Sequence, residues 1–160
     1  MPDHEPTADL AVGFTRLVIP VAEVSHAVAG AHIALLDPFL PAALMDEGVL
    51  RELREIFADL VPFAYVLGEA ARFPSGAAYL PPQPVGVFRR ITGNLRRTFP
   101  EVVGHPTSLH GSIPHLALGD SAADVVSTPL EVHAHEAVLL VGTGAEQKVL
   151  ARFAFGTSAA

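Results

Sequence analysis

Cysteine is absent from the sequence, which excludes disulfide bonds, thiolate catalysis and zinc sites built on sulfur. Any bound metal would need histidine and carboxylate ligands. Long apolar runs are also missing, since stretches such as 137–141 are far too short to cross a bilayer. The first ten residues, MPDHEPTADL, contain neither a basic start nor a hydrophobic segment. This predicts a cytoplasmic protein without an export signal and without a membrane partner.

Positive charge is scarce, and the formal net charge of the chain is −7. This balance argues against a protein that holds long nucleic acid by bulk electrostatics. Four of the ten cations nevertheless fall close together, at Arg89, Arg90, Arg96 and Arg97. Their forked donors could grip phosphates, and a solvated helix face explains them equally well.

The length of 160 residues fits one domain with a generous core. We expect residues 1–12 to form a flexible tail and residues 13–160 to form a single domain. Apolar residues at helical spacing predict a helix over 46–60, and a second helix from Pro84 that presents Phe88, Ile91 and Leu95 to the core. Two helical turns are expected over 21–30, before Gly30. Strands are expected over 14–20, 31–36, 63–67, 77–80, 115–118, 130–141 and 149–155.

Two of these expected strands carry the same motif. AHIALLDPF (31–39) and PHLALGD (114–120) each contain a His, an aliphatic residue, an Ala and a Leu, about half the chain apart. This spacing indicates an internal duplication. Because side chains alternate along a strand, His32 shares a face with Ala34, and His115 shares a face with Ala117.

Two histidines on facing strands suit general acid–base catalysis, because one imidazole can accept a proton while the other donates one. Transfer at a phosphodiester is the obvious reaction. The alternative is that each ring is an ordinary core histidine held by hydrogen bonds. The repeat of the motif favours the catalytic interpretation.

The two motifs resemble the paired signatures of the 2H phosphoesterase superfamily, and in particular the bacterial 2′-5′ RNA ligase family. Members carry His, a hydrophobic residue, Thr or Ser, and a hydrophobic residue twice, the first often followed by a Pro-Phe pair such as Pro38-Phe39. Residues 72–84, the helix after them and ARFAFG (151–156) are also similar to this family. The resemblance therefore covers most of residues 14–156.

This resemblance implies an α+β, bilobal fold with two antiparallel sheets and a pseudo-two-fold duplication around a central cleft. It implies that His32 and His115 are acid and base on a 2′,3′-cyclic phosphate or a 2′-5′ linkage in a small molecule or a short RNA end. It requires no metal and no cofactor. Substrate-binding positions carried over from the family are Ala34, Ala117, Tyr79, Arg72 and Phe73.

The sequence departs from the family pattern at Ala34 and Ala117, where the phosphate-binding hydroxyls should stand. Loss of one well-placed donor typically costs about 10²- to 10³-fold in rate. Three interpretations stay open: an impaired phosphodiesterase, a nucleotide or small-ligand binder without turnover, or a His-pair enzyme acting on a less charged metabolite. Hydroxyls that could substitute are those of Thr107, Ser108 and Ser112.

Histidines outside the two motifs give weaker signals. His133 and His135 would point the same way from one strand, and with Glu131 or Glu136 they could be metal ligands. A half-exposed strand face is the default interpretation of this pattern. His105 and His110 are expected in a loop rich in proline and glycine.

Overall fold

The computed structural model describes residues 13–100, 114–118, 126–142 and 147–156. The predicted tail 1–12 lies outside the described residues. Along the chain, the described elements are β1 (Thr15–Pro20), the 3-10 turn η1 (Ala22–Val24), β2 (His32–Leu36), the 3-10 turn η2 (Ala42–Leu44), α2 (Glu47–Ala58), β3 (Phe63–Leu67), β4 (Ala71–Arg72), β5 (Ala78–Leu80), β6 (Pro82–Gln83), α3 (Val85–Thr98), β7 (Leu116–Ala117), β8 (Leu130–Ala134), β9 (Glu136–Val141) and β10 (Lys148–Ala154).

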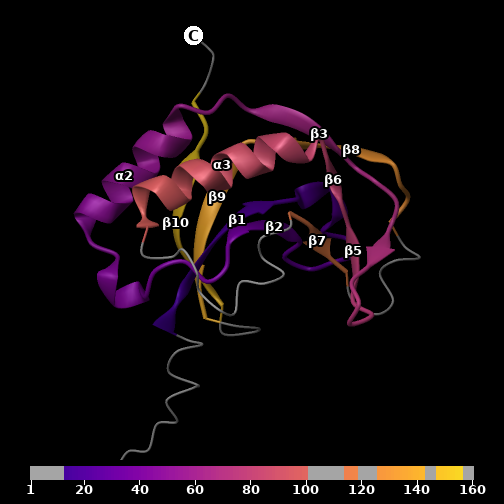
Figure 1. Ribbon diagram of the computed structural model, residues 1–160, viewed down its shortest axis with the longest axis horizontal. Helices are drawn as coiled ribbons and strands as arrows, with labels where there is room; N and C mark the ends of the chain where they lie inside the picture. Colours follow the sequence, from indigo (N-terminus) through magenta and orange to yellow (C-terminus); the bar gives the residue numbers. More distant parts are fainter. Residues whose placement is uncertain (1–12, 101–113, 119–125, 143–146, 157–160) are drawn as a thin grey trace, which may run out of the picture.

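The strands form two antiparallel sheets. The larger sheet has the order β10-β9-β1-β2-β7-β5-β4, and the smaller one has the order β6-β3-β8. Helix α2 contacts β10 and helix α3 contacts β2, so both helices cover the same face of the larger sheet (Figure 1). The α+β class with two antiparallel sheets, expected from the sequence, is confirmed.

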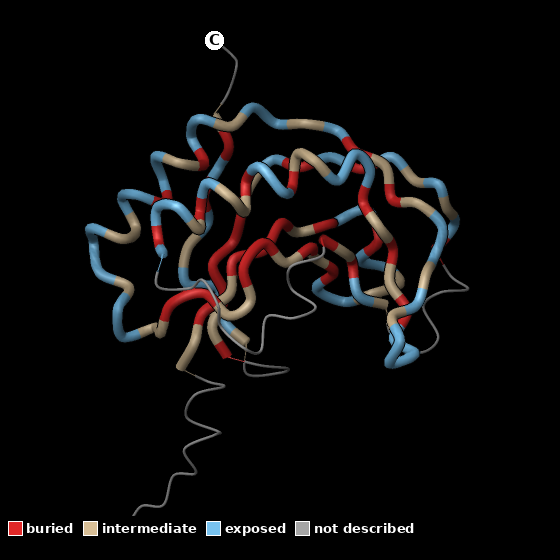
Figure 2. Tube along the Cα trace, viewed as in Figure 1, coloured by how far each residue is buried: buried red, intermediate tan, exposed pale blue. Residues whose placement is uncertain are grey.

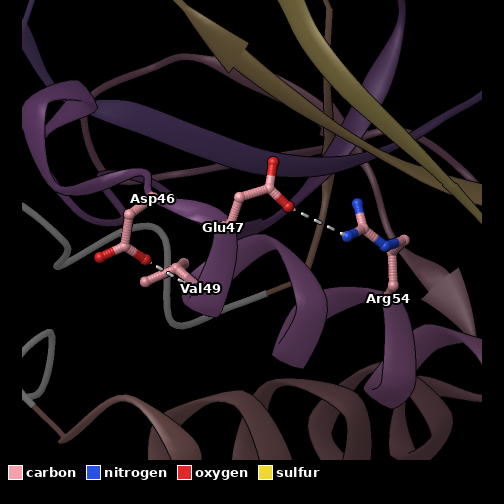
Figure 3. A network of polar contacts seen from close by, with 4 residues as sticks. All are labelled: Asp46, Glu47, Val49 and Arg54. Atoms are coloured by element: carbon pink, nitrogen blue, oxygen red, sulfur yellow. Dashed lines mark hydrogen bonds and ion pairs between the residues drawn. The ribbon is translucent and has the colours of Figure 1, made fainter.

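Helix α2 begins where the sequence predicts it. Asp46 is extended and its carboxylate accepts a hydrogen bond of 2.9 Å from the backbone N–H of Val49, which caps the first turn (Figure 3). Glu47 lies 3.8 Å from Arg54 on the exposed side of the same helix. On the other side, Leu53 and Phe57 are fully buried. Amphipathic spacing thus positions the helix on the core.

Helix α3 follows Pro84 and buries Phe88, Ile91 and Leu95, as predicted. Its hydroxyl Thr92 Oγ1 donates to the backbone carbonyl of Leu35 in β2 at 3.4 Å. Together with the apolar contacts, this interaction holds the helix against the strand that carries the first motif.

The prediction of a single long strand over 130–141 is wrong. The segment divides at His135 into β8, which pairs with β3 in the smaller sheet, and β9, which pairs with β1 and β10 in the larger one. Burial differs accordingly: Val132 and Ala134 of β8 alternate with exposed residues, whereas Ala137 and its three successors in β9 are all buried. The carbonyl of His135 accepts a hydrogen bond from the N–H of Phe155, which fixes the residue between the two strands to the C-terminal segment.

The helical turns expected over 21–30 are reduced to the 3-10 turn η1 and the bends after it. The chain must reverse before β2, and it does so at Gly30, whose φ of +67° is strained for any residue with a Cβ. Val21 donates to the carbonyl of Ala31 at 2.9 Å across this loop.

The main core lies between the sheets and the helices, and Figure 2 shows buried segments concentrated there. One row of it crosses four neighbouring strands, β1, β2, β7 and β5, through Ile19, Ile33, Leu116 and Leu80. Each of these side chains is at most 1% exposed. This row fixes which face of each strand is turned away from the helices, since neighbouring positions must point to the opposite side.

No helix within the described ranges is long and apolar enough to span a membrane.

Candidate active site on the sheet

The two motif strands, β2 and β7, are direct neighbours in the larger sheet. Ile33 is paired with Leu116, and the strands are antiparallel. This register places His32 opposite Ala117 and Ala34 opposite His115. The two motifs are therefore related by a local two-fold axis through the central pair, and the two histidines are diagonal neighbours. Diagonal positions on such a pair lie about 7–8 Å apart.

Both histidines lie on the face of the sheet opposite the helices. Ile33 and Leu116 belong to the core between strands and helices, so the side chains beside them in sequence point the other way. We call this surface, defined by His32, Ala34, His115 and Ala117, the histidine face. Ile33 and Leu116 are fully buried, whereas His32 and His115 are half-buried.

The ring of His32 is held by its own chain. Its Nδ1 lies 2.9 Å from the carbonyl oxygen of Gly30, and this contact requires a proton on Nδ1. Burial lowers the pKa of His32 below 6.5, and the charges of Arg16 and His115 act in the same direction, while the Gly30 carbonyl and Asp37 oppose them. The neutral ring therefore turns an unprotonated Nε2 outward, as a proton acceptor requires.

The ring of His115 lies among aromatic side chains. It meets Phe73 edge to face at 5.0 Å between ring centroids and Tyr79 at 5.7 Å. Phe73 and Tyr79 themselves stack at 4.1 Å. Tyr79 is also paired with Ala117 across β5 and β7, which places it on the histidine face. Four of the five predicted substrate-binding residues, Ala34, Ala117, Tyr79 and Phe73, therefore lie next to the histidines.

Arg72 is not brought to that face. It is paired with Ala78, which faces the core side of β5, and its Nη1 donates to the carbonyl of Gly76 at 2.8 Å. The guanidinium closes the turn between β4 and β5, so the structure gives Arg72 a different surrounding from the one expected.

Two charged residues missing from the sequence interpretation join the site. Along β1 and β2, Val18 is paired with Ala34 but Leu17 is paired with Leu36, so β2 contains one extra residue, a β-bulge. The bulge reverses the alternation, so Leu36 stays in the core. Asp37 follows it, close enough to Arg16, His32 and His115 for their charges to act on its carboxylate. A lone Arg in the apolar string FTRLVIP was the available signal for Arg16. The bulge had none.

The surroundings of Ala34 are apolar. Val18, Val138 and Leu140, from β1 and β9, form a small buried cluster on the histidine face, and Ala34 packs against it. The position where the family places a hydroxyl therefore continues an aliphatic surface. The side chains of this cluster are all aliphatic, so none of them can donate a hydrogen bond to a phosphate.

His133 of β8 and His135, which directly follows that strand, are both exposed. His133 and His135 stack at 6.3 Å, and His133 Nδ1 lies 3.6 Å from a carboxylate oxygen of Glu23. Among the described residues, no three histidine or acidic side chains are placed so that they could hold a metal ion. Thr107, Ser108, Ser112, His105 and His110 lie outside the described residues.

The arginines of α3 are mostly exposed, as expected, and α3 itself covers the face of the sheet opposite the histidine face. Three of them border a shallow hollow of about 360 Å³ together with Gly93 and Asn94; they are Arg89, Arg90 and Arg97. They take no part in the candidate site.

Comparison with known proteins identifies a family. The model of the 2′-5′ RNA ligase superfamily matches residues 22–140, a segment that contains both motifs and both helices. No curated protein sequence matches the chain.

Three solved structures share the fold. E. coli LigT complexed with 3′-AMP has a TM-score of 0.63 and 15% sequence identity, and covers 89% of this chain and 98% of its own. A phosphoesterase has a TM-score of 0.58 and 17% identity, covering 90% of this chain and 98% of its own. LigT complexed with NADP+ has a TM-score of 0.58 and 18% identity, covering 89% and 98%. With three quarters of its length matched by the family model, the chain belongs to the 2′-5′ RNA ligase superfamily.

Proposed function

We propose that this protein hydrolyses a 2′,3′-cyclic phosphate or a 2′-5′ phosphodiester in a small molecule or a short RNA end. The observation that carries the proposal is the diagonal placement of His32 and His115 on one sheet face, in a chain of the 2′-5′ RNA ligase superfamily. Superfamily membership supplies the substrate class. The His pair supplies an acid and a base without a metal ion.

The hydrogen bond at His32 favours one assignment of roles. Its Nδ1 proton is directed to Gly30, so the unprotonated Nε2 is placed to accept the proton of an attacking water. Water adds to phosphorus, the bond from phosphorus to one ribose oxygen breaks, and His115 donates a proton to that oxygen. The product is a terminal phosphate, and a second proton exchange restores the pair.

The stacked pair of Phe73 and Tyr79 supports a nucleoside as the organic part of the ligand. The two rings present an aromatic surface beside His115, and bases stack on such surfaces at about 1–3 kcal/mol each. LigT has been crystallised with 3′-AMP and with NADP+, two ligands that contain adenosine.

A binding protein without turnover is the second candidate, and Ala34 and Ala117 favour it. Neither side chain can donate to a phosphate oxygen, and Ala34 adjoins an apolar cluster. Such a site could hold a nucleotide through the aromatic pair and the two imidazoles alone.

A turnover assay separates the two candidates. Hydrolysis of 2′,3′-cyclic AMP is followed by ³¹P NMR for the native protein, His32→Gln and His115→Gln, with the exposed His26→Gln as a matched control. General acid–base catalysis predicts a loss of about 10²-fold or more in each site variant and none in the control. Equal background rates in all four proteins, together with saturable nucleotide binding, would establish the binder instead.

A further inference from the structure

The bulge in β2 turns a carboxylate onto the histidine face. Leu17 is paired with Leu36, the last residue of β2, and Asp37 follows directly after it. The charges of Arg16, His32 and His115 all act on the Asp37 carboxylate, which places it beside the histidine pair. Bulges that redirect side chains in this way are frequent next to active sites.

The Asp37 carboxylate has no partner among the described residues. It makes no hydrogen bond and no ion pair there, although the residue is half-buried. Neither of its oxygens is sealed from solvent. A carboxylate that is partly desolvated, accessible and unpaired is available to a ligand.

Three charged or titratable groups act on Asp37: Arg16 of β1, His32 at the start of β2, and His115, which directly precedes β7. Burial raises the pKa of Asp37 above 3.8, and these three groups, Arg16 foremost, lower it. The guanidinium of Arg16 is directed elsewhere, because its Nη2 donates to the carbonyl of Gly142 at 2.9 Å and to the side chain of Gln147. Arg16 moderates the charge of Asp37 without binding it.

Building on the proposed phosphodiester function, we propose that Asp37 makes the histidine face selective for a singly charged phosphodiester over a doubly charged terminal phosphate. Ala34 and Ala117 offer no donors that could offset a second negative charge. A terminal phosphate has a second pKa near 6 and is mostly dianionic at neutral pH, so it meets the carboxylate with one charge more than a diester does. Since hydrolysis of a cyclic phosphate makes this terminal phosphate, Asp37 also favours product release.

Two ligands that differ by one charge test the proposal. Adenosine 3′-(methyl phosphate) is a monoanionic diester, and adenosine 3′-phosphate is the corresponding monoester without the methyl group. Dissociation constants for both are measured by calorimetry at pH 7.5 for the native protein, Asp37→Asn and the control Asp59→Asn. Asp59 is an exposed carboxylate at the end of α2.

We expect the native protein to bind the diester more tightly. In Asp37→Asn the preference should fall about fivefold, mainly through tighter binding of the monoester, because a like charge several ångströms away has been removed. The control should keep the native ratio. An unchanged ratio in Asp37→Asn, with both ligands bound, overturns the charge selectivity alone. Absence of binding of either ligand to the native protein at millimolar concentration overturns the phosphodiester function as well.

Discussion

At the scale of single residues, the neutral ring of His32 sets the pH range in which the site can work. Burial and the charge of Arg16 lower the pKa of His32, so its base form persists below pH 6.5. The pH profile of kcat/KM for 2′,3′-cyclic AMP should therefore show an acid limb below pH 6.5. In Arg16→Gln the limb should move upward, because one of the charges that disfavour protonation is gone. A limb at or above 6.5 in the native protein would contradict the assignment of His32 as base.

The two alanines of the motifs offer a gain-of-function experiment. Thr at positions 34 and 117 would restore the side-chain donors of the family pattern, and Thr is close in shape to the Val residues around Ala34. We expect Ala34→Thr/Ala117→Thr to raise the hydrolysis rate about tenfold or more, since a single oxyanion donor is commonly worth at least this much. Adding His32→Gln to the double variant should abolish the gain. A rate that stays at the native level would show that missing donors are not what limits turnover.

The carboxylate of Asp37 should cost stability at neutral pH. Because burial raises its pKa above 3.8, the folded state binds the proton more tightly than the unfolded chain. The stabilisation from protonation is complete below pH 3.8 and is lost as the pH rises through the folded-state pKa. Asp37→Asn should therefore melt at a higher temperature than the native protein at pH 7, and the difference should shrink toward pH 3.8. A difference independent of pH would contradict this explanation.

Simple alternation along the strands was enough to predict that His32 shares a face with Ala34 and that His115 shares one with Ala117. Alternation could not place Asp37. Every second residue after His32 should share its face, which predicts Leu36 there, but the bulge shifts this alternation by one residue. Arg72 was expected beside the ligand from its segment alone. Its position depends on the register of β4 against β5, which puts Arg72 opposite Ala78.

At the scale of elements, α3 contains a glycine that its helix does not need. A Cβ on Gly93 would meet only the Arg97 guanidinium at 3.8 Å, an ordinary contact. Gly93→Ala should therefore stabilise the protein by about 0.5–1 kcal/mol in urea unfolding, through the higher helix propensity of Ala. Gly30→Ala is the matched contrast, and it should destabilise, since φ is +67° at that position. Equal effects of the two substitutions would contradict the backbone argument.

Both helices were predictable because each depends on local chemistry. Asp46 caps α2, Pro84 precedes α3, and the buried residues follow at helical spacing. The segment 130–141 was not predictable in the same way. Its composition suits a strand throughout, but the break at His135 arises from the pairing partners of β8 and β9, which are β3 and β1. Sheet membership is a property of partners distant in sequence.

At the scale of the whole molecule, the end of the described chain is fastened to α2. Phe57 of the helix stacks on Phe153 at 5.7 Å and on Phe155 at 6.0 Å, and Phe63 stacks on Phe155 at 6.1 Å. Gly156 follows so closely that a Cβ there would lie 2.0 Å from the backbone oxygen of Ala58. Helix α2, strand β10 and the residues after β10 are therefore closely packed against one another.

Gly156→Ala should destabilise the protein by about 1–3 kcal/mol, because the backbone of α2 or of the C-terminal segment must move to relieve the overlap. The urea midpoint, read by far-UV circular dichroism, measures the change. Gly13→Ala is a suitable control, since a Cβ there has no atom within 4 Å. A midpoint equal to that of the native protein would show that this end of the chain is loosely attached.

The passage of one short segment from β8 into β9 has a mechanical consequence. With a single residue between two strands that belong to different sheets, neither sheet can separate from the other without pulling on the neighbour's hydrogen bonds. His135 therefore links the two sheets covalently, and its carbonyl accepts a hydrogen bond from the backbone N–H of Phe155. We expect the two sheets to melt together, in one cooperative step, so that ligand held on the larger sheet also protects amides of the smaller one from hydrogen exchange.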